Sequence, residues 1–221
     1  DIPEATWKNV GAPEEVDDLR CAAIEKTTLR DALEVCLRDA DPTDHLNLNS
    51  RAALARSLVR ETPVPESIKS AIAAEYGKLC EMYSPGVDVA VRSSATTEDS
   101  ADASFAGQYE SYLNVSGEQD IIEKWRRCVA SMFTERAIGY HLEHNMHPLD
   151  SAIAVVVMKM ARSDKGSSGV MFTIDPDSGH EGVIHIGSSY GLGELVVQGV
   201  VSPDTFTAVS YTHLTLPTRR F

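Results

Sequence analysis

The sequence predicts an α+β fold, in which a helical first third precedes a region of mixed strands and helices. Apolar residues recur with the helical period in several segments before residue 83, whereas short β-branched runs bounded by turn residues predominate after residue 152. Helices followed by strands that can pair in antiparallel fashion are typical of α+β proteins. With 221 residues, the chain is long enough to bury one full core.

Three helices are predicted in the first third, over residues 28–38, 50–59 and 65–82. Thr27 or Thr28 can cap the first of them with its hydroxyl group. The charged residues of this region fall mostly on the polar faces of the helices, which is typical of solvated surfaces. We therefore expect no catalytic or ligand-binding residues in the first third.

The central stretch, residues 89–114, is the candidate site. Residues 89–91 predict a buried strand and residues 112–115 predict a second. The loop between them is rich in small and hydroxyl-bearing residues, with Arg92 at its entrance and Gly107 near its exit. Small side chains let a ligand approach the backbone, and a guanidinium suits phosphate, so the loop can hold a polyphosphate. A solvated connection with a surface arginine is the other interpretation.

Two further helices are predicted over residues 118–132 and 134–145. His141, His144 and His147 recur every third residue in and just beyond the second helix. Side chains at this spacing rotate by about 60° per step around a helix, so three imidazoles cannot easily reach one ion. The spacing predicts structural or surface roles for these histidines, and we predict no metal ligands in this chain.

From residue 152 onward the pattern is that of strands, predicted over residues 153–160, 169–174, 182–186 and 205–209. Turns are expected at residues 163–166 and 175–179. The glycine-rich residues 187–194 follow a strand and precede a short predicted helix, an arrangement whose free amides can bind an anion. They lack the ending of a Walker loop and the dinucleotide fingerprint. Gly191 and Gly193 are thus explained equally well as nucleotide contacts and as turn residues.

Composition excludes several classes of partner. The net charge of −13 would repel nucleic acid and anionic membrane surfaces. No apolar run approaches the length of a membrane span and no signal peptide is visible, so we expect a cytoplasmic protein. The four cysteines, Cys21, Cys36, Cys80 and Cys128, are widely spaced, which predicts free thiols instead of a disulfide framework or a zinc site.

Two sequence blocks carry a resemblance to a known family. The first has Val-Arg-Ser-Ser-Ala at residues 91–95, then Glu-Asp at 98–99 and Ala-Ser-Phe-Ala-Gly-Gln at 103–108. The second has Ser-Gly-Val-Met-Phe-Thr-Ile-Asp at 168–175 and a glycine-rich run at 189–199. In order and spacing the blocks resemble the nucleotide-binding domain of phosphoenolpyruvate synthases, which pyruvate phosphate dikinases and rifampin phosphotransferases share.

The resemblance implies an ATP-grasp-like fold, in which two lobes close on ATP and Mg²⁺. Arg92 matches the phosphate-contacting arginine of the family, which makes it the expected catalytic residue, and Gly107 matches a glycine of the nucleotide loop. Ser111 stands where relatives such as the rifampin enzymes have threonine, so the hydroxyl is kept. Met158 stands where glutamine is frequent near the adenine. Because methionine lacks an amide, any adenine contact there would be apolar or made by the main chain.

The implied activity is that of phosphoenolpyruvate synthase, which converts pyruvate to phosphoenolpyruvate with ATP and water and releases AMP and phosphate. The phosphoryl group passes to a histidine on a separate domain of the same polypeptide. We find no match for the family's glycine-rich lysine segment, its downstream metal ligands or its phosphohistidine domain. The chain is therefore expected to be an internal fragment, inactive alone and with weak ATP affinity.

Three regions are predicted: a helical part of the nucleotide-binding domain at residues 1–88, an ATP-grasp-like core at 89–209 and a tail at 210–221. The tail fits no family pattern and resembles translated adapter or vector sequence.

Two alternatives to a phosphoenolpyruvate synthase remain. One is the same domain of a rifampin phosphotransferase or pyruvate phosphate dikinase, against which residues 196–204 favour the synthase. The other is an inactive nucleotide-binding or structural piece.

Overall fold

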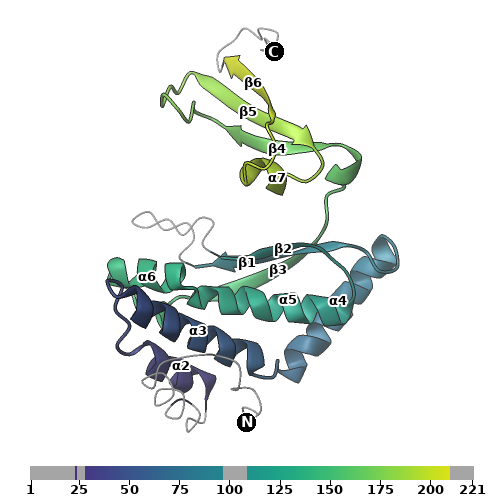
Figure 1. Ribbon diagram of the computed structural model, residues 1–221. Helices are drawn as coiled ribbons and strands as arrows, with labels where there is room; N and C mark the ends of the chain where they lie inside the picture. Colours follow the sequence, from purple (N-terminus) through teal and green to yellow (C-terminus); the bar gives the residue numbers. More distant parts are fainter. Residues whose placement is uncertain (1–22, 24–27, 97–108, 210–221) are drawn as a thin grey trace. The chain divides into compact units, whose positions relative to one another are not determined.

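The computed structural model describes residue 23 and residues 28–96 and 109–209. The chain divides into two compact units, with the boundary after Met160. Both units contain helical segments and an antiparallel sheet, which confirms the α+β prediction (Figure 1). The division into residues 1–88, 89–209 and 210–221 stays a prediction, and the last of these regions lies outside the described residues.

Between residues 28 and 88, all of which are described, the first unit has three helices, which confirm the helical first third: α2 (Leu29–Leu37), α3 (His45–Glu61) and α4 (Glu66–Met82). Thr28 caps α2, because its hydroxyl accepts a hydrogen bond from the N–H of Asp31. Helix α3 begins at His45 and not at residue 50, because the carboxylate of Asp44 accepts hydrogen bonds from backbone N–H groups of its first turn. Across the described ranges, no helix has both the length and the apolar character that a membrane span needs.

Three strands of the first unit form an antiparallel sheet in the order β2-β1-β3. They are β1 (Val89–Ala95), β2 (Ser111–Val115) and β3 (Ile153–Lys159). The prediction that the first strand ends at residue 91 is wrong, because residues 92–95 belong to β1 and not to a loop. All seven residues of β1 pair with β3. The hydrogen bonds of this ladder satisfy the backbone N–H and C=O groups of residues 92–95, whose local composition is typical of a loop.

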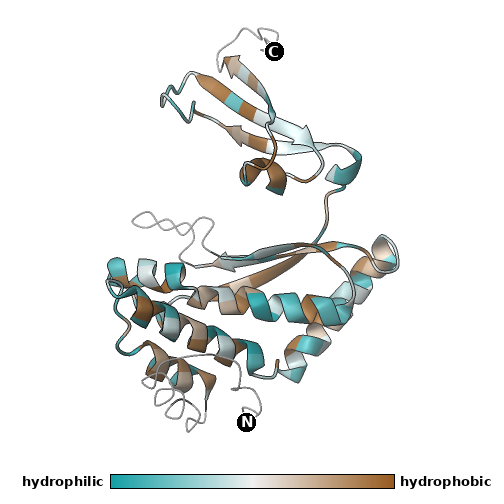
Figure 2. Cartoon of the chain, in the orientation of Figure 1, coloured by the Kyte–Doolittle hydropathy of each residue, from teal (hydrophilic) through white to brown (hydrophobic). Residues whose placement is uncertain are grey.

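Helix α5 (Glu118–Ala130) covers one face of this sheet (Figure 1). Its Ile121 and Cys128 share a core with Val89 and Val91 of β1, and all four side chains are fully buried. In Figure 2, β3 is brown along most of its length, whereas the helices alternate between teal and brown. The helices therefore bury one apolar stripe each and leave their polar faces to solvent.

After α5 come a 3-10 turn (Ser131–Phe133), helix α6 (Glu135–Glu143) and another 3-10 turn (Pro148–Asp150). The histidines of this region have the structural roles that their spacing predicts. Buried His141 donates from Nδ1 to the Ala137 carbonyl at 2.7 Å and accepts at Nε2 from the Ser151 hydroxyl at 2.8 Å. His144 and His147 bond nearby backbone groups through Nδ1. Within the described residues, no group of three or more His, Cys, Asp or Glu side chains can hold a metal ion.

Acid is expected to destabilise the first unit through His141. Burial lowers the pKa of this imidazole below its ordinary value of 6.5, and the charges of His144 and His147 add to the effect. Between the two pKa values, His141 binds a proton in the unfolded chain but not in the folded chain. Its contribution to the free energy of unfolding is fully present above the unfolded pKa. This contribution falls as the pH drops toward the folded pKa, by at most about 1.4 kcal/mol per pH unit.

Urea unfolding at about pH 7 and about pH 5.5 measures this loss of stability. Carboxylates with lowered pKa values become protonated only below this range, so they do not contribute to the difference. His141→Gln should remove most of the difference between the two conditions. The same change at exposed His180 should leave it intact. An unchanged difference in His141→Gln would assign the acid sensitivity to another group.

The cysteines of the described residues carry no disulfide. Cys36, Cys80 and Cys128 are free, as their spacing predicts, and Cys21 lies outside the described residues. Burial raises the pKa of Cys36 to about 12 and that of Cys128 to about 11. Both buried thiols therefore stay protonated at neutral pH and act as small apolar core residues.

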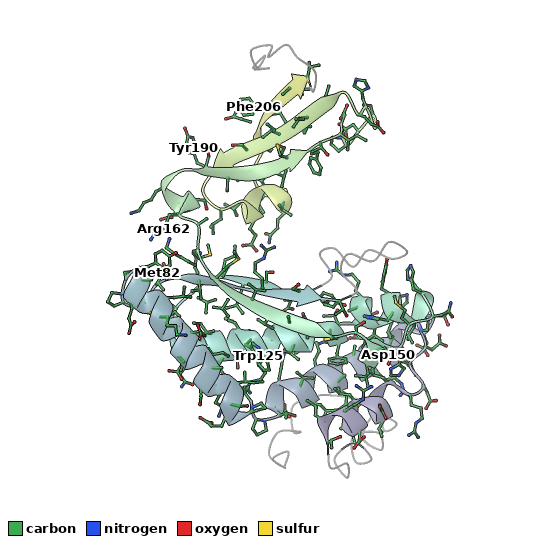
Figure 3. The ribbon with its side chains drawn as sticks, turned by 180° about the vertical axis from the view of Figure 1, so that it is seen from behind. Met82, Trp125, Asp150, Arg162, Tyr190 and Phe206 are labelled. Carbon is green, nitrogen blue, oxygen red and sulfur yellow. The ribbon has the colours of Figure 1, made fainter. Side chains whose placement is uncertain are left out.

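The second unit contains a sheet in the order β4-β5-β6, again antiparallel. Its elements are a 3-10 turn (Ser163–Lys165), β4 (Ser167–Phe172), β5 (Val183–Tyr190), α7 (Glu194–Val197) and β6 (Asp204–Val209). The expected turns at 163–166 and 175–179 are confirmed. Arg162, labelled in Figure 3, forms a two-pronged ion pair with Asp164 at 2.8 and 2.6 Å, and this contact lowers the pKa of Asp164.

Strand β5 is longer than predicted, because residues 187–190 are strand and not the start of a glycine-rich turn. They pair with residues 167–170 of β4. The glycine and serines of this stretch have low strand propensity, and pairing on both sides overrides it.

Candidate functional site

The exposed face of the β2-β1-β3 sheet carries the arginine that the sequence singles out. Side chains alternate between the two faces along a strand. Val89 and Val91 of β1 are fully buried in the core with α5. Arg92 is the next residue and therefore lies on the opposite face, where it is exposed.

The strand register brings Ser111 and Met158 to the same face. Ser111 of β2 lies directly opposite Arg92, and Val156 of β3 is the partner of Arg92 on its other side. Met158 lies two residues beyond Val156 and shares its face. Side chains directly opposite each other have Cβ atoms about 4.5–5.5 Å apart, and diagonal neighbours are about 7–8 Å apart. Arg92 is therefore next to both Ser111 and Met158 on one surface.

This face combines a cation, a hydroxyl and an apolar strip. Val156 and Met158 are 45% and 46% exposed, although both are apolar residues of a strand. In the described part of the chain, the guanidinium of Arg92 has no carboxylate partner. A guanidinium beside a hydroxyl suits the oxygens of a phosphate, and an exposed apolar strip suits a planar base.

Hydrogen bonds that the sequence does not reveal fix the start of β2 beside Ser111. The carbonyl of Glu110 accepts from the Ser93 hydroxyl at 3.2 Å, and its N–H donates to the Ser131 hydroxyl at 3.2 Å. Burial raises the pKa of Tyr112, and the hydrogen bond from its hydroxyl to the Glu110 carboxylate raises it further. The partners of Glu110 on β1 and after α5 are distant in sequence, so no local pattern indicates them.

The other predicted contacts are not placed on this face. Gly107 lies outside the described residues, and Gly191 and Gly193 belong to the second unit. Gly191 has a φ of 88°, a left-handed conformation that favours glycine, and its carbonyl accepts a hydrogen bond from Ser168. Helix α7, which follows Gly193, has four residues. The turn geometry alone thus accounts for Gly191.

The exposed face does not fit a magnesium site. Mg²⁺ takes oxygen ligands, mainly from carboxylates and phosphates. None of the residues of β1, β2 and β3 is an aspartate or glutamate. Any magnesium ligands from the protein must therefore come from other parts of the molecule.

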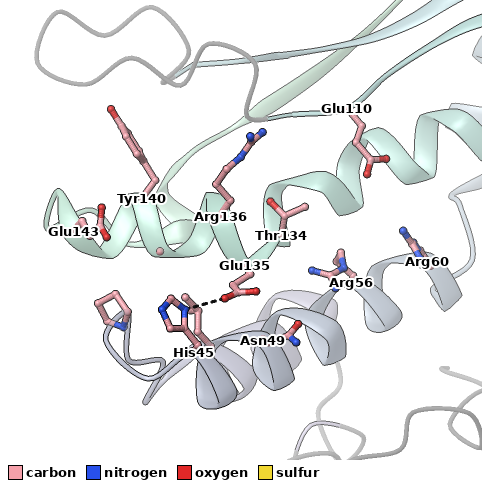
Figure 4. Close-up of a pocket in the computed structure, with 13 residues that line it drawn as sticks. His45, Asn49, Arg56, Arg60, Glu110, Thr134, Glu135, Arg136, Tyr140 and Glu143 are labelled. Carbon is pink, nitrogen blue, oxygen red and sulfur yellow. Dashed lines mark hydrogen bonds and ion pairs between the residues drawn. The ribbon is translucent and has the colours of Figure 1, made fainter. Parts of the chain in front are cut away.

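A pocket of about 640 Å³ lies between α3 and α6 (Figure 4). Arg56 and Arg60 of α3 line it, together with an ion pair between His45 and Glu135, whose Nδ1 and Oε1 are 3.3 Å apart. The charged residues of the helical region are predicted to lie mostly on solvated faces, and Arg51 and Arg56 are two that do not. Arg56 is half-buried, and Arg51 is buried, with its guanidinium donating to the Cys36 carbonyl at 3.0 Å. Because each helix supplies only part of the lining, neither helix alone reveals the pocket in its sequence.

Comparison with known proteins gives a family match and several close relatives. A family model described as the pyruvate phosphate dikinase AMP/ATP-binding domain matches residues 20–218. This range extends past residue 209, and the origin of residues 210–221 stays a prediction.

Three relatives are similar to most of this chain. Phosphoenolpyruvate synthase of Synechocystis sp. is 46% identical over 188 residues, which are 83% of this chain and 23% of the relative. The enzyme of the same name from Aquifex aeolicus is 45% identical over 184 residues, 83% of this chain and 22% of the relative. A probable phosphoenolpyruvate synthase of Archaeoglobus fulgidus is 46% identical over 183 residues, 83% and 24% of the two chains. The chain thus spans about a quarter of the length of these relatives.

Proposed function

The chain belongs to the pyruvate phosphate dikinase AMP/ATP-binding domain family, and we propose that its β2-β1-β3 face binds ATP as part of a phosphoenolpyruvate synthase. The observation that carries this proposal is the common face of Arg92, Ser111 and Met158. They come from three different strands, and the register places Ser111 and Met158 on either side of Arg92. The side chains of Arg92 and Ser111 suit the phosphates of a nucleotide, and that of Met158 suits its base.

The roles follow from the side chains. Arg92 holds phosphate oxygens with its planar fork and offsets the negative charge that gathers on them. The hydroxyl of Ser111, directly opposite, donates to one of those oxygens. Met158 and Val156 offer the base an apolar surface, and polarizable methionine adapts to a flat ring. The match of Gly107 to a glycine of the family's nucleotide loop makes it a further proposed contact of the phosphates.

The whole enzyme converts pyruvate, ATP and water to phosphoenolpyruvate, AMP and phosphate in the cytoplasm. The present residues position ATP so that a phosphoryl group reaches a histidine on a separate domain of the polypeptide. Positioning and charge neutralisation provide most of the catalysis of phosphoryl transfer. Mg²⁺ bound together with ATP would offset the negative charge of the phosphates, and no carboxylate of the β2-β1-β3 face would hold it. The fold that performs these tasks is ATP-grasp-like.

A charge placed on the apolar strip tests the proposed nucleotide face. Met158→Glu in the intact enzyme is expected to weaken ATP binding by about tenfold or more, because a carboxylate repels the phosphates and disfavours the base. Titration calorimetry with ATP measures the effect. Leu46→Glu is the matched control, since Leu46 is 82% exposed on α3, away from this face. Equal ATP affinities for the two variants would rule out this face as the nucleotide site.

A further inference from the structure

We propose that the pocket between α3 and α6 binds a small phosphorylated molecule, whose phosphate is held by Arg56 and Arg60. This site is separate from the proposed nucleotide face and does not depend on it. The two arginines lie one helical turn apart on α3, and both line the pocket. Side chains at this spacing lie on one face of a helix, so both guanidiniums can reach one anion.

The position of Arg56 is defined by its contacts. Its guanidinium donates to the carbonyl of Phe133 at 3.1 Å, which leaves its other N–H groups available to a ligand. No ion pair between described residues involves Arg56 or Arg60. Burial lowers the pKa of Arg56, and the positive charge of Arg60 lowers it further, whereas the carboxylates of Glu110 and Glu135 raise it. Two neighbouring cations that repel each other gain from an anion placed between them.

The acidic residues of the pocket have other partners or lie apart from Arg60. Glu135 pairs with His45, and the carboxylate of Glu110 accepts a hydrogen bond from the Tyr112 hydroxyl. Glu143 lies at the opposite end of the pocket from Arg60 (Figure 4). The arginine end therefore suits a phosphate, whereas the end with His45 and Glu135 suits hydroxyl groups.

The size of the pocket agrees with a small ligand. Its volume of about 640 Å³ lies within the range of roughly 300–1,000 Å³ that is typical of small-molecule sites. Asn49 lies between the two ends on α3 and offers both a donor and an acceptor (Figure 4). The chemical class that fits is a phosphate monoester with hydroxyl groups on the remaining carbon atoms.

Titration of the protein with glycerol 3-phosphate, and with glycerol as the uncharged probe, tests the site by calorimetry. Saturable binding of the phosphate ester alone is expected. The double change Arg56→Gln and Arg60→Gln should weaken it by about tenfold or more, because both charge-assisted contacts are lost. Arg30→Gln with Arg38→Gln changes the net charge equally at exposed positions outside the pocket, and binding should persist.

Additional variants separate the possible outcomes. Arg60→Gln alone alters an exposed side chain, so it should keep the fold, checked by circular dichroism, and still weaken binding. Arg92→Ala should leave binding of glycerol 3-phosphate unchanged. No saturable binding, or equal affinity in the double variant and its control, would overturn the proposal. Loss of binding in Arg92→Ala would also overturn it, because the probe would then occupy the nucleotide face.

Discussion

Arg92→Ala is expected to slow ATP-dependent phosphorylation of the intact enzyme by about 100-fold or more, because one preorganised charge contact to the reacting phosphate is lost. The fold should not change. Arg92 is an exposed residue of β1. Its pairing with β3 uses backbone groups that alanine also has, so the pairing does not depend on the side chain. Single-turnover phosphorylation with labelled ATP, together with unfolding in urea, measures both quantities.

Two further substitutions define what Arg92 contributes. Arg92→Lys keeps the charge but loses the planar fork, so an intermediate rate is expected. Arg38→Ala removes the same charge at an exposed position just after α2 and should not alter the rate. If Arg92→Ala phosphorylates at the original rate, Arg92 has no part in the reaction and the proposed nucleotide face loses its central residue.

Gly169→Ala is expected to destabilise the second unit by about 1–3 kcal/mol or more, as overpacking does in well-packed regions. A Cβ atom at Gly169 would lie 1.9 Å from the carbonyl oxygen of Gly187 and 2.7 Å from the Cα of Ser188. Both are backbone atoms of the paired strand β5, so no side-chain rotation can relieve the clash. Hydrogen exchange of peptides from β4 and β5 should become faster.

Gly187→Ala is the matched control within the same ladder. Its added Cβ would meet Pro203 Cγ at 3.5 Å as the nearest atom, which is an ordinary van der Waals contact. Hydrogen exchange of β4 and β5 should therefore stay close to that of the original protein. Similar exchange rates in the two variants would show that the ladder adjusts to a side chain at Gly169.

Much of the fold is predictable from the sequence, because helix and strand periods are local properties. The apolar spacing over residues 65–82 predicts α4, and the β-branched run over 153–160 predicts β3. The errors occur where local composition and long-range pairing disagree. Residues 92–95 and 187–190 are rich in serine and other residues of low strand propensity, yet both stretches are strands because neighbouring strands bind their backbones.

The candidate site is predictable in its residues but not in its arrangement. The resemblance to the family selects Arg92, Ser111 and Met158, although they are separated along the chain by up to 66 positions. Their common face depends on the register of β1 with both β2 and β3, and a shift of one residue would move a strand's side chains to the other face. The pocket with Arg56 and Arg60 gives no sequence signal, since helical spacing alone does not identify the partner of α3.

The sequence by itself determined where most helices and strands lie, a threonine cap of α2 at residue 27 or 28 and, through two motif blocks, the family to which the chain belongs. The tertiary structure alone decided which side chains share a surface. The physical reason is the range of the forces involved: capping and periodic burial act within a few residues, whereas strand register and helix packing join segments that are far apart in the chain.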